Sequence, residues 1–194
     1  TRWDQGSPVN CVAYSPNGSG FVVCMDDGGL IFYTPTSSEA AWESYEHEYG
    51  VKKLAFSANG ALLASASHDQ TVRLWNPQDG SQLKVIEIGE TITSLAFSTT
   101  SPGEDQPGFL AAGLDNGKIV VWQIERGAGM KALATLQAHD AAVTALLFAR
   151  DNSLLASGSA DGLIRIWNMA DGTMNTEIPA NGSEVTGLTL APDD

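Results

Sequence analysis

Apolar residues recur along the chain in short stretches separated by polar turns. Three such stretches follow one another as Val143–Phe148, Leu154–Ser159 and Leu163–Trp167. In the third, Arg165 stands between two isoleucines, the period-two alternation of a β-strand with one face toward a core. The intervening Ala-Arg-Asp-Asn and Ala-Asp-Gly sequences have the Asx and glycine chemistry of tight hairpin turns. The pattern predicts an antiparallel meander.

The same pattern repeats throughout the chain. The first apolar residue of each copy returns at spacings of 42, 41, 51 and 42 residues, at Val9, Val51, Ile92, Val143 and Val185. The aromatic residue of the third stretch returns at Tyr33, Trp75, Trp122 and Trp167. We predict four complete units at residues 9–46, 51–88, 92–137 and 143–179. Residues 1–5 would then be the outer strand of a preceding unit, and residues 184–194 the first strand of a following one.

The repeated segments, such as VKKLAFSANGALLASASHDQTVRLWN from Val51 to Asn76, resemble the WD-repeat family. The Trp-Asp pair typical of that family is degraded here, for example to Trp75-Asn76 and Trp167-Asn168. The resemblance implies an all-β fold, a β-propeller in which each repeat of about 40 to 45 residues makes one four-stranded antiparallel blade. Four blades are too few for the rings usual in this family, so we expect a part of a seven- or eight-bladed ring.

Two of the repeats carry the same four polar or aromatic residues in the same order. They are His47, Ser65, Asp69 and Trp75 in the second repeat, and His139, Ser157, Asp161 and Trp167 in the fourth. Serine, histidine and aspartate together could form a catalytic triad, but a triad needs one copy, whereas this set recurs. The resemblance implies structural hydrogen-bond tetrads. The third repeat lacks the full set, having Ala112 and Asn116 at the serine and aspartate positions.

Other site chemistry is absent from the sequence. It contains no phosphate-binding glycine loop and no Cys/His set at zinc spacing, and the Asp26-Asp27-Gly28-Gly29 stretch lacks the alternating acids of a calcium loop. We therefore predict no catalytic residues, no cofactor and no metal. The apolar stretches are too short to span a membrane and no signal segment opens the chain, so a membrane partner is not expected.

The net charge of −13 and the loop positions of the acids point to a protein or peptide partner rather than nucleic acid. The blade-to-blade connections and second hairpin turns should share one face and contain no lysine or arginine. The acids expected on that face are Asp26, Asp27, Glu46, Glu48, Asp69, Glu90, Asp115, Asp140, Asp161 and Glu184. The face could simply be solvated, or it could bind a basic peptide or a basic domain of the same polypeptide.

The two cysteines, Cys11 and Cys24, fall opposite each other if the first hairpin turns at Asn17-Gly18. Two cysteines in 194 residues do not make a disulfide scaffold and suit a reducing compartment. We expect two small buried apolar side chains rather than a disulfide.

The sequence thus predicts a noncatalytic scaffold for protein–protein interaction, cytoplasmic, with a nuclear location not excluded. The alternative is a propeller sensor array attached to a nucleotide-binding switch domain or an enzyme outside this segment. The length favours a piece of a longer protein. A second explanation is closure in trans, in which two chains form a homodimer with one eight-bladed ring, and a closed four-bladed ring ranks third.

Overall fold

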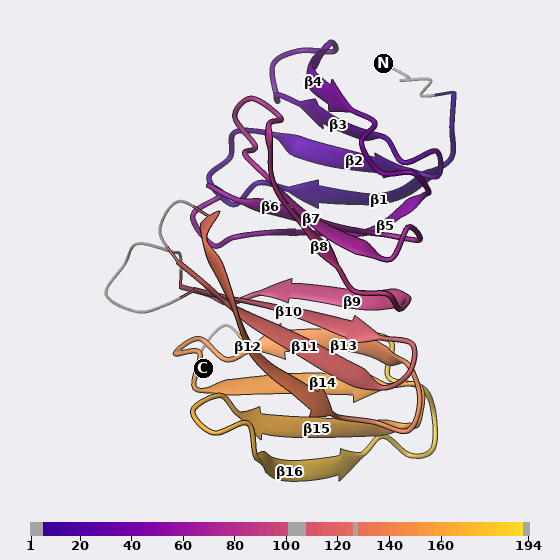
Figure 1. Cartoon of the computed structure of the whole chain (residues 1–194), viewed down its shortest axis with the longest axis vertical. Coiled ribbons are helices and arrows are strands. Elements are labelled where there is room, and N and C mark those ends of the chain that lie inside the picture. Colours follow the sequence, from indigo (N-terminus) through magenta and orange to yellow (C-terminus); the bar gives the residue numbers. More distant parts are fainter. Residues whose placement is uncertain (1–5, 101–107, 126–127, 192–194) are drawn as a thin grey trace. The chain divides into compact units, whose positions relative to one another are not determined.

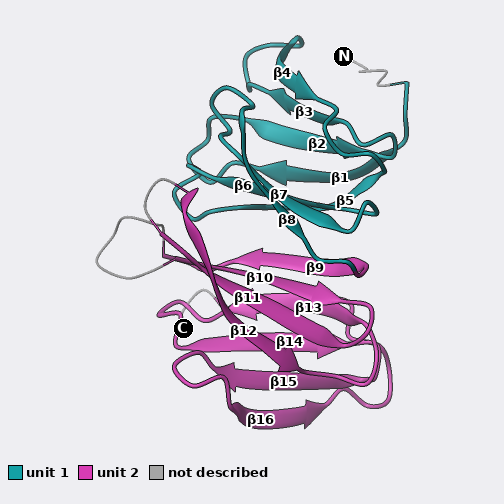
Figure 2. Ribbon diagram, viewed as in Figure 1, with its two compact units in different colours: residues 1–89 teal, residues 90–194 magenta. Residues whose placement is uncertain are grey.

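The structure is a computed structural model that describes residues 6–100, 108–125 and 128–191. These residues form four separate four-stranded antiparallel sheets, each a meander in sequence order (Figure 1). The prediction of an all-β fold built from four-stranded blades is confirmed. Contacts divide the chain into two compact units, residues 1–89 and 90–194, which hold two blades each (Figure 2).

Unit 1 contains the first two blades. Blade 1 consists of β1 (Val9–Tyr14), β2 (Phe21–Met25), β3 (Leu30–Tyr33) and β4 (Ala40–Ser44). Blade 2 consists of β5 (Val51–Phe56), β6 (Leu63–Ser67), β7 (Thr71–Trp75) and β8 (Gln82–Glu87).

Unit 2 contains the other two blades. Blade 3 consists of β9 (Ile92–Phe97), β10 (Gly108–Leu114), β11 (Lys118–Ile124) and β12 (Met130–Gln137). Blade 4 consists of β13 (Val143–Phe148), β14 (Leu154–Ser159), β15 (Leu163–Asn168) and β16 (Met174–Pro179).

Each unit has an apolar core between the facing sheets of its two blades. In unit 1 the first blade contributes Phe32, whose ring stacks on Trp42 with centroids 5.6 Å apart, and the second contributes the buried Trp75. In unit 2 the corresponding core holds Phe148 and Trp167 against Ile119 and Val121 of the preceding blade. Residues that point to the same side of neighbouring strands therefore form both cores, as the period-two alternation requires.

A bulge follows the first apolar residue of each of the four blades. The register shifts between Val9 and Cys11, between Val51 and Lys53, between Ile92 and Ser94, and between Val143 and Ala145. In unit 1, Nδ2 of Asn10, the extra residue of the first bulge, donates to the carbonyl oxygen of Val51 at 3.0 Å. In unit 2, Oγ1 of Thr93 donates to the carbonyl oxygen of Val143 at 2.7 Å. Polar side chains thus join the first strands of neighbouring blades.

The cysteine prediction is wrong. Cys11 and Cys24 are a direct cross-strand pair of β1 and β2 with Cα atoms 5.1 Å apart, and their sulfur atoms are bonded. The hairpin register predicted from the sequence placed them opposite each other, and at that separation the geometry suits a disulfide. The total number of cysteines therefore gave the wrong answer, because the local pairing and not the count decides whether a bond forms.

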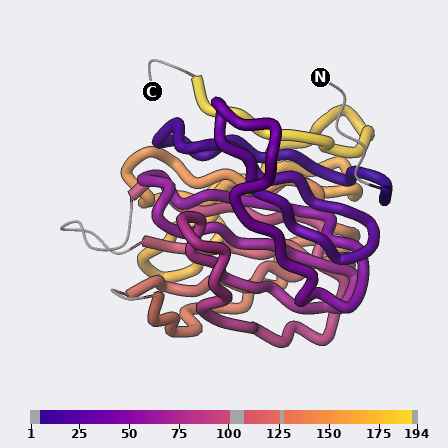
Figure 3. Tube along the Cα trace, turned by 90° about the horizontal axis from the view of Figure 1, so that it is seen from above, coloured from indigo at the N-terminus to yellow at the C-terminus, as the bar shows by residue number. Residues whose placement is uncertain are grey.

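Two further strands were predicted at the ends of the chain, at residues 1–5 and 184–194. The outer strand predicted at residues 1–5 lies outside the described residues, and so do residues 192–194. Residues 184–191 contain no strand, although their path is extended (Figure 3). Val185 is anchored there: it is buried, its N–H bonds to the Ser159 carbonyl at 3.0 Å, and its carbonyl accepts from Thr144. The first strand predicted at residues 184–194, and the following blade to which it would belong, stay predictions.

Candidate functional site

The two histidines of the predicted tetrads lie in the loops that lead from one blade to the next. Each loop is held by the second hairpin turn of the preceding blade. The N–H of His139 donates to the carbonyl of Gly117 at 2.9 Å, and Gly117 has φ of +81°. A Cβ at Gly117, or at the equivalent Gly28 of blade 1, would collide with the backbone carbonyl of His139 or His47. Glycine is needed at both turns to let the histidine backbone approach.

In blade 2 the four predicted residues form one connected network. Nδ1 of His47 lies 2.7 Å from Oδ2 of Asp69, and Nε2 lies 2.7 Å from Oγ of Ser65. The indole N–H of Trp75 donates to the same Ser65 oxygen at 2.8 Å. Because a carboxylate only accepts, Nδ1 carries the imidazole proton, and the Ser65 hydroxyl donates to Nε2.

Blade 4 repeats this geometry almost unchanged. Nδ1 of His139 lies 2.9 Å from Oδ2 of Asp161, Nε2 lies 2.8 Å from Oγ of Ser157, and the Trp167 N–H donates to that oxygen at 2.9 Å. Asp161 also fixes its own turn, because Oδ1 accepts the Leu163 N–H at 3.0 Å. The structure therefore brings together all eight residues predicted for the two tetrads.

Burial sets the charge state of both networks. It lowers the pKa of His47 and of His139 more than the hydrogen bonds and charges of their aspartates raise it. Burial acts in the opposite direction on Asp69 and Asp161, but the hydrogen bonds to their carboxylates, led by that from the histidine, outweigh it and hold the pKa below its ordinary value. At pH 7 each network thus contains a neutral imidazole and an ionised carboxylate.

This arrangement offers no accessible nucleophile. Ser65 and Ser157 are both fully buried, and each hydroxyl already accepts from an indole and donates to an imidazole. A serine nucleophile must reach a substrate carbonyl with its oxygen, next to an oxyanion site. The network instead gives each buried polar group a hydrogen-bond partner. Without a partner, each group would lower the stability of the fold by about 1–3 kcal/mol.

Blades 1 and 3 show what remains when the set is incomplete. Blade 1 has the buried Val23 at the serine position, and its Asp27 accepts only the Gly29 N–H, at 3.0 Å. In blade 3, Ala112 is fully buried and Asn116 accepts the Lys118 N–H at 3.2 Å. In these two blades the acid or amide side chain therefore bonds within its own turn and orients no histidine.

In unit 1, the predicted acidic face is partly neutralised. Its acids are Asp26, Asp27, Glu46, Glu48 and Asp69. Lys52 of β5 bonds to Asp26 at 2.6 Å, and this hydrogen bond lowers the pKa of the carboxyl. Arg73 of β7 lies 3.8 Å from Asp69 and 4.0 Å from Glu46. The loops contain no lysine or arginine, as predicted, but cations from the strands reach their acids.

In unit 2, the predicted acids are Glu90, Asp115, Asp140, Asp161 and Glu184. Asp161 belongs to the tetrad, whereas the other four are exposed. Within the described part of the chain, no salt bridge joins these four acids to a basic side chain, and the same holds for Glu48 of unit 1. The unpaired negative charge of the predicted face is therefore carried mainly by these positions.

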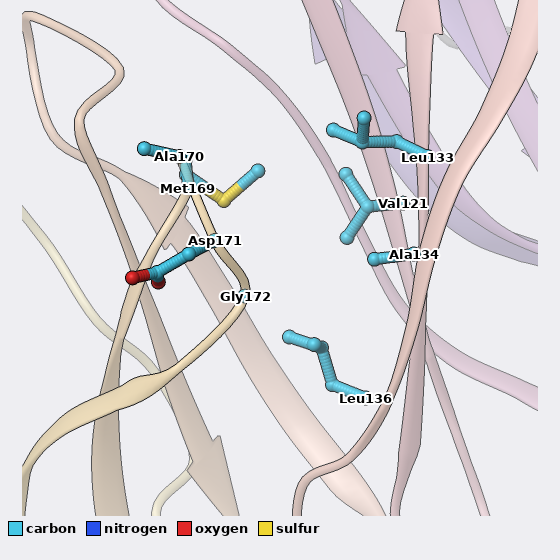
Figure 4. A pocket seen from close by; sticks show the side chains of 8 residues that line it. All are labelled: Val121, Leu133, Ala134, Leu136, Met169, Ala170, Asp171 and Gly172. Carbon is cyan, nitrogen blue, oxygen red and sulfur yellow. The ribbon is translucent and has the colours of Figure 1, made fainter.

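A small pocket that the sequence did not reveal lies in unit 2. It lies between the outer strand of blade 3 and the turn that joins β15 to β16, and has a volume of about 150 Å³. Figure 4 shows Leu133, Leu136 and Val121 on one side and Met169 and Asp171 on the other. Sites for small molecules commonly measure about 300–1,000 Å³, so this pocket is small for a substrate. No sequence signal could have found it, because its two walls are about 35 residues apart in the chain.

Metal-binding clusters and membrane-spanning helices are both absent from the described residues. No group of three or more His, Cys, Asp or Glu side chains is placed to hold a metal ion. No helix in that part of the chain is long and apolar enough to cross a membrane.

Four-stranded meander blades with a recurring Trp-Ser-His-Asp network define a repeat protein of the propeller class. The family described as WD domain, G-beta repeat matches residues 3–34, 42–76 and 130–168. The chain therefore belongs to the WD-repeat family. The matches include both complete tetrads, whereas the first three strands of blade 3 lie outside them.

Relatives of the chain are longer WD-repeat proteins. It is 29% identical to actin-interacting protein 1 of Drosophila melanogaster over 97% of this chain and 30% of that protein. It is 30% identical to periodic tryptophan protein 2 of Arabidopsis thaliana over 95% of this chain and 20% of that protein. It is 28% identical to small ribosomal subunit protein RACK1y of Oryza sativa subsp. japonica over 84% of this chain and 48% of that protein. The chain thus spans less than half of each relative.

A solved structure shows the same fold. A chain in the crystal structure of a mitotic checkpoint complex superposes with a TM-score of 0.83 at 24% identity, covering 98% of this chain and 59% of that one. This likeness supports the propeller-blade architecture, and blade number beyond the four present here stays a prediction.

Proposed function

We propose that the chain is a noncatalytic scaffold segment that mediates protein–protein interaction within a larger protein or complex. The observation that carries this proposal is the complete burial of both hydroxyls that could have served as nucleophiles. The relatives support it by their names, one of which describes an actin-interacting protein and another a component of the small ribosomal subunit. The same reasoning assigns the two Trp-Ser-His-Asp networks a structural role and the chain no enzymatic activity.

We propose that the acidic loops of each unit bind a basic protein or peptide. The support is the set of exposed acids that no basic side chain of the described residues neutralises, including Glu48 in unit 1 and Asp140 in unit 2. Complementary charge accelerates encounter and favours a basic partner over an acidic one. The contribution of Asp26 is smaller, because Lys52 already pairs with it.

Charge reversal tests this surface. We expect the Glu48→Lys, Asp140→Lys double variant to bind an immobilised lysine-rich peptide at least about tenfold more weakly than the wild type, measured at low salt because exposed charges are screened at high salt. Glu39→Lys, Glu125→Lys is the matched control, since both residues are exposed acids that follow the third strand of a blade and lie outside the acidic loops. Unchanged binding by the first variant, or an equal loss in the control, would remove the proposal.

Self-association is a second candidate, because blade 1 exposes positions that are covered in blade 2. Val12 and Tyr14 of β1 are 54% and 72% exposed. Their counterparts by repeat position, Leu54 and Phe56, pack against blade 1 in the core of unit 1. An exposed apolar edge of this kind favours association, here with a second chain that completes a ring in trans.

Light scattering decides this question. A homodimer would have twice the 20.4 kDa mass of the chain, and Tyr14→Lys would reduce it to the monomer. Val85→Lys serves as the control, because Val85 is an exposed apolar residue of the outer strand β8. A monomer at every concentration up to about 100 μM would exclude closure in trans.

A cytoplasmic location, with the nucleus as the alternative, is also part of the proposal. This location is supported by the relatives, one of which is a small ribosomal subunit protein. The cysteine argument no longer does, because Cys11 and Cys24 are bonded and disulfides are rare in cytosolic proteins.

A further inference from the structure

The Cys11–Cys24 bond lies where blade 2 presses against blade 1. Cys24 is fully buried in the apolar core that includes Val51, and the partly exposed Cys11 packs against this core. Val51 begins β5, which lies beside β1 (Figure 1). Next to Cys11, the amide of Asn10 bonds both to the Val51 carbonyl at 3.0 Å and to Asp26 at 3.1 Å. The disulfide is therefore part of the contact between two blades.

The same position in unit 2 shows how little room this contact leaves. The equivalent cross-strand pairs are Ser94 with Gly113 in blade 3 and Ala145 with Gly158 in blade 4. A Cβ at Gly113 would lie 2.7 Å from Cβ of Val143, the valine that begins the next blade. A Cβ at Gly158 would likewise collide with Val185. Where the following valine packs in unit 2, one member of the pair is glycine.

Unit 1 fills this position with two cysteines, and the bond between them saves the space. Bonded sulfur atoms stand about 2 Å apart, whereas two separate thiols must stay at van der Waals distance, near 3.5–4 Å. Opening the bond therefore adds volume beneath Val51 and at the same time removes the covalent link between β1 and β2. Cores packed at native density do not absorb extra volume without backbone or side-chain shifts.

We propose that Cys11–Cys24 is a redox modification site whose reduction loosens the contact between blades 1 and 2. The reductant is a protein or small-molecule dithiol. Its thiolate attacks Sγ of the more accessible Cys11, the S–S bond breaks, and Cys24 leaves as a thiolate that takes a proton. The second thiol of the reductant then attacks the mixed disulfide and releases the Cys11 thiol. The protein gains two electrons and two protons, and the reductant becomes a disulfide.

Hydrogen–deuterium exchange of the full chain, with and without dithiothreitol, tests the proposal. Reduction should accelerate amide exchange at least about tenfold in β1, β2 and β5, and leave β13 to β16 within about twofold. Intact mass should rise by two hydrogens, and both cysteines should then react with iodoacetamide. The melting temperature of the chain should fall by roughly 8–15 °C, because loss of a disulfide and overpacking both destabilise the folded state.

The chain itself supplies the matched control. The Cys11→Ala, Cys24→Gly variant copies the Ala145 and Gly158 pair of blade 4 and can neither form nor lose the bond. Its exchange should be the same with and without dithiothreitol, which separates the disulfide from other effects of the reductant. Two results would overturn the proposal. The first is alkylation of both thiols in protein that was purified without reductant and incubated with oxidised glutathione. The second is unchanged amide exchange in β1 and β5 after complete reduction. Neither bears on the scaffold proposal.

Discussion

The Asp161→Ala variant should lower the free energy of unfolding by about 2–4 kcal/mol. The carboxylate accepts from Nδ1 of His139 and from the N–H groups of Leu163 and Asp140, at 2.9, 3.0 and 3.3 Å. The His139 side chain is fully buried, so its N–H would be left without a partner, and an unpaired buried donor costs about 1–3 kcal/mol. Loss of the turn bonds adds to this cost. Denaturant unfolding followed by circular dichroism measures it.

Asn116→Ala is the matched control for this variant. Asn116 occupies the same turn position in blade 3 but is exposed and accepts only the Lys118 N–H, so the expected loss is at most about 1 kcal/mol. Asp161→Asn should cause a loss of stability between these two values. One carboxylate oxygen is replaced by an NH2 group, which donates and cannot accept from the N–H group that faced that oxygen. Equal losses for Asp161→Ala and Asn116→Ala would contradict the structural role of the tetrad.

The second large effect is a loss of stability in mild acid. The unfolded chain takes up a proton on each histidine near pH 6.5. In the folded chain, burial lowers the pKa of His47 and His139, so protonation there requires a lower pH. Between the two values the unfolded state binds more protons, and stability falls as the pH falls. The slope reaches at most about 1.4 kcal/mol per pH unit for each histidine.

The lowered pKa values of Asp69 and Asp161 act in the same direction at lower pH. Their contribution is present above about pH 4 and is lost as the pH falls through their folded values. Urea unfolding at pH 7, 6 and 5 measures the histidine part. The His47→Leu, His139→Leu variant should be less stable at pH 7 but show a flatter dependence, whereas His68→Gln should match the wild type, because His68 is exposed. A wild-type curve flat from pH 7 to 5 would contradict the assignment of neutral imidazoles.

The strands and the two tetrads were accessible from the sequence because they depend on short-range patterns that recur. The stretch predicted at Val143–Phe148 is β13. The alternation expected around Arg165 is not seen in burial, because Ile164 and Ile166 are half-buried, and the β15 residue in the core of unit 2 is Trp167, two positions after Arg165. The resemblance to the WD-repeat family then placed His47 with Ser65 and Asp69, although up to 22 residues separate them. A repeated pattern carries tertiary information, because equivalent residues must satisfy equivalent contacts.

Contacts that do not repeat could not be predicted in this way. Lys52 reaches Asp26 from a strand of the next blade, and Arg73 reaches Glu46 across a turn, so the charge of the acidic loops depends on side chains outside them. The pocket lined by Leu133 and Met169 depends on two walls from different blades. Each of these contacts occurs at one place in the fold, so no repeated sequence pattern predicts it.

The sequence by itself determined the class of fold and the strands of the four blades, since alternation and repetition are properties of the chain, and the residues of the tetrads followed from its resemblance to the WD-repeat family. Only the tertiary structure decided the state of Cys11 and Cys24 and the neutralisation of Asp26. The physical reason is the same in each case. A bond or an ion pair needs a partner at a set distance, and that distance is fixed by packing between segments and not by the order of residues within one.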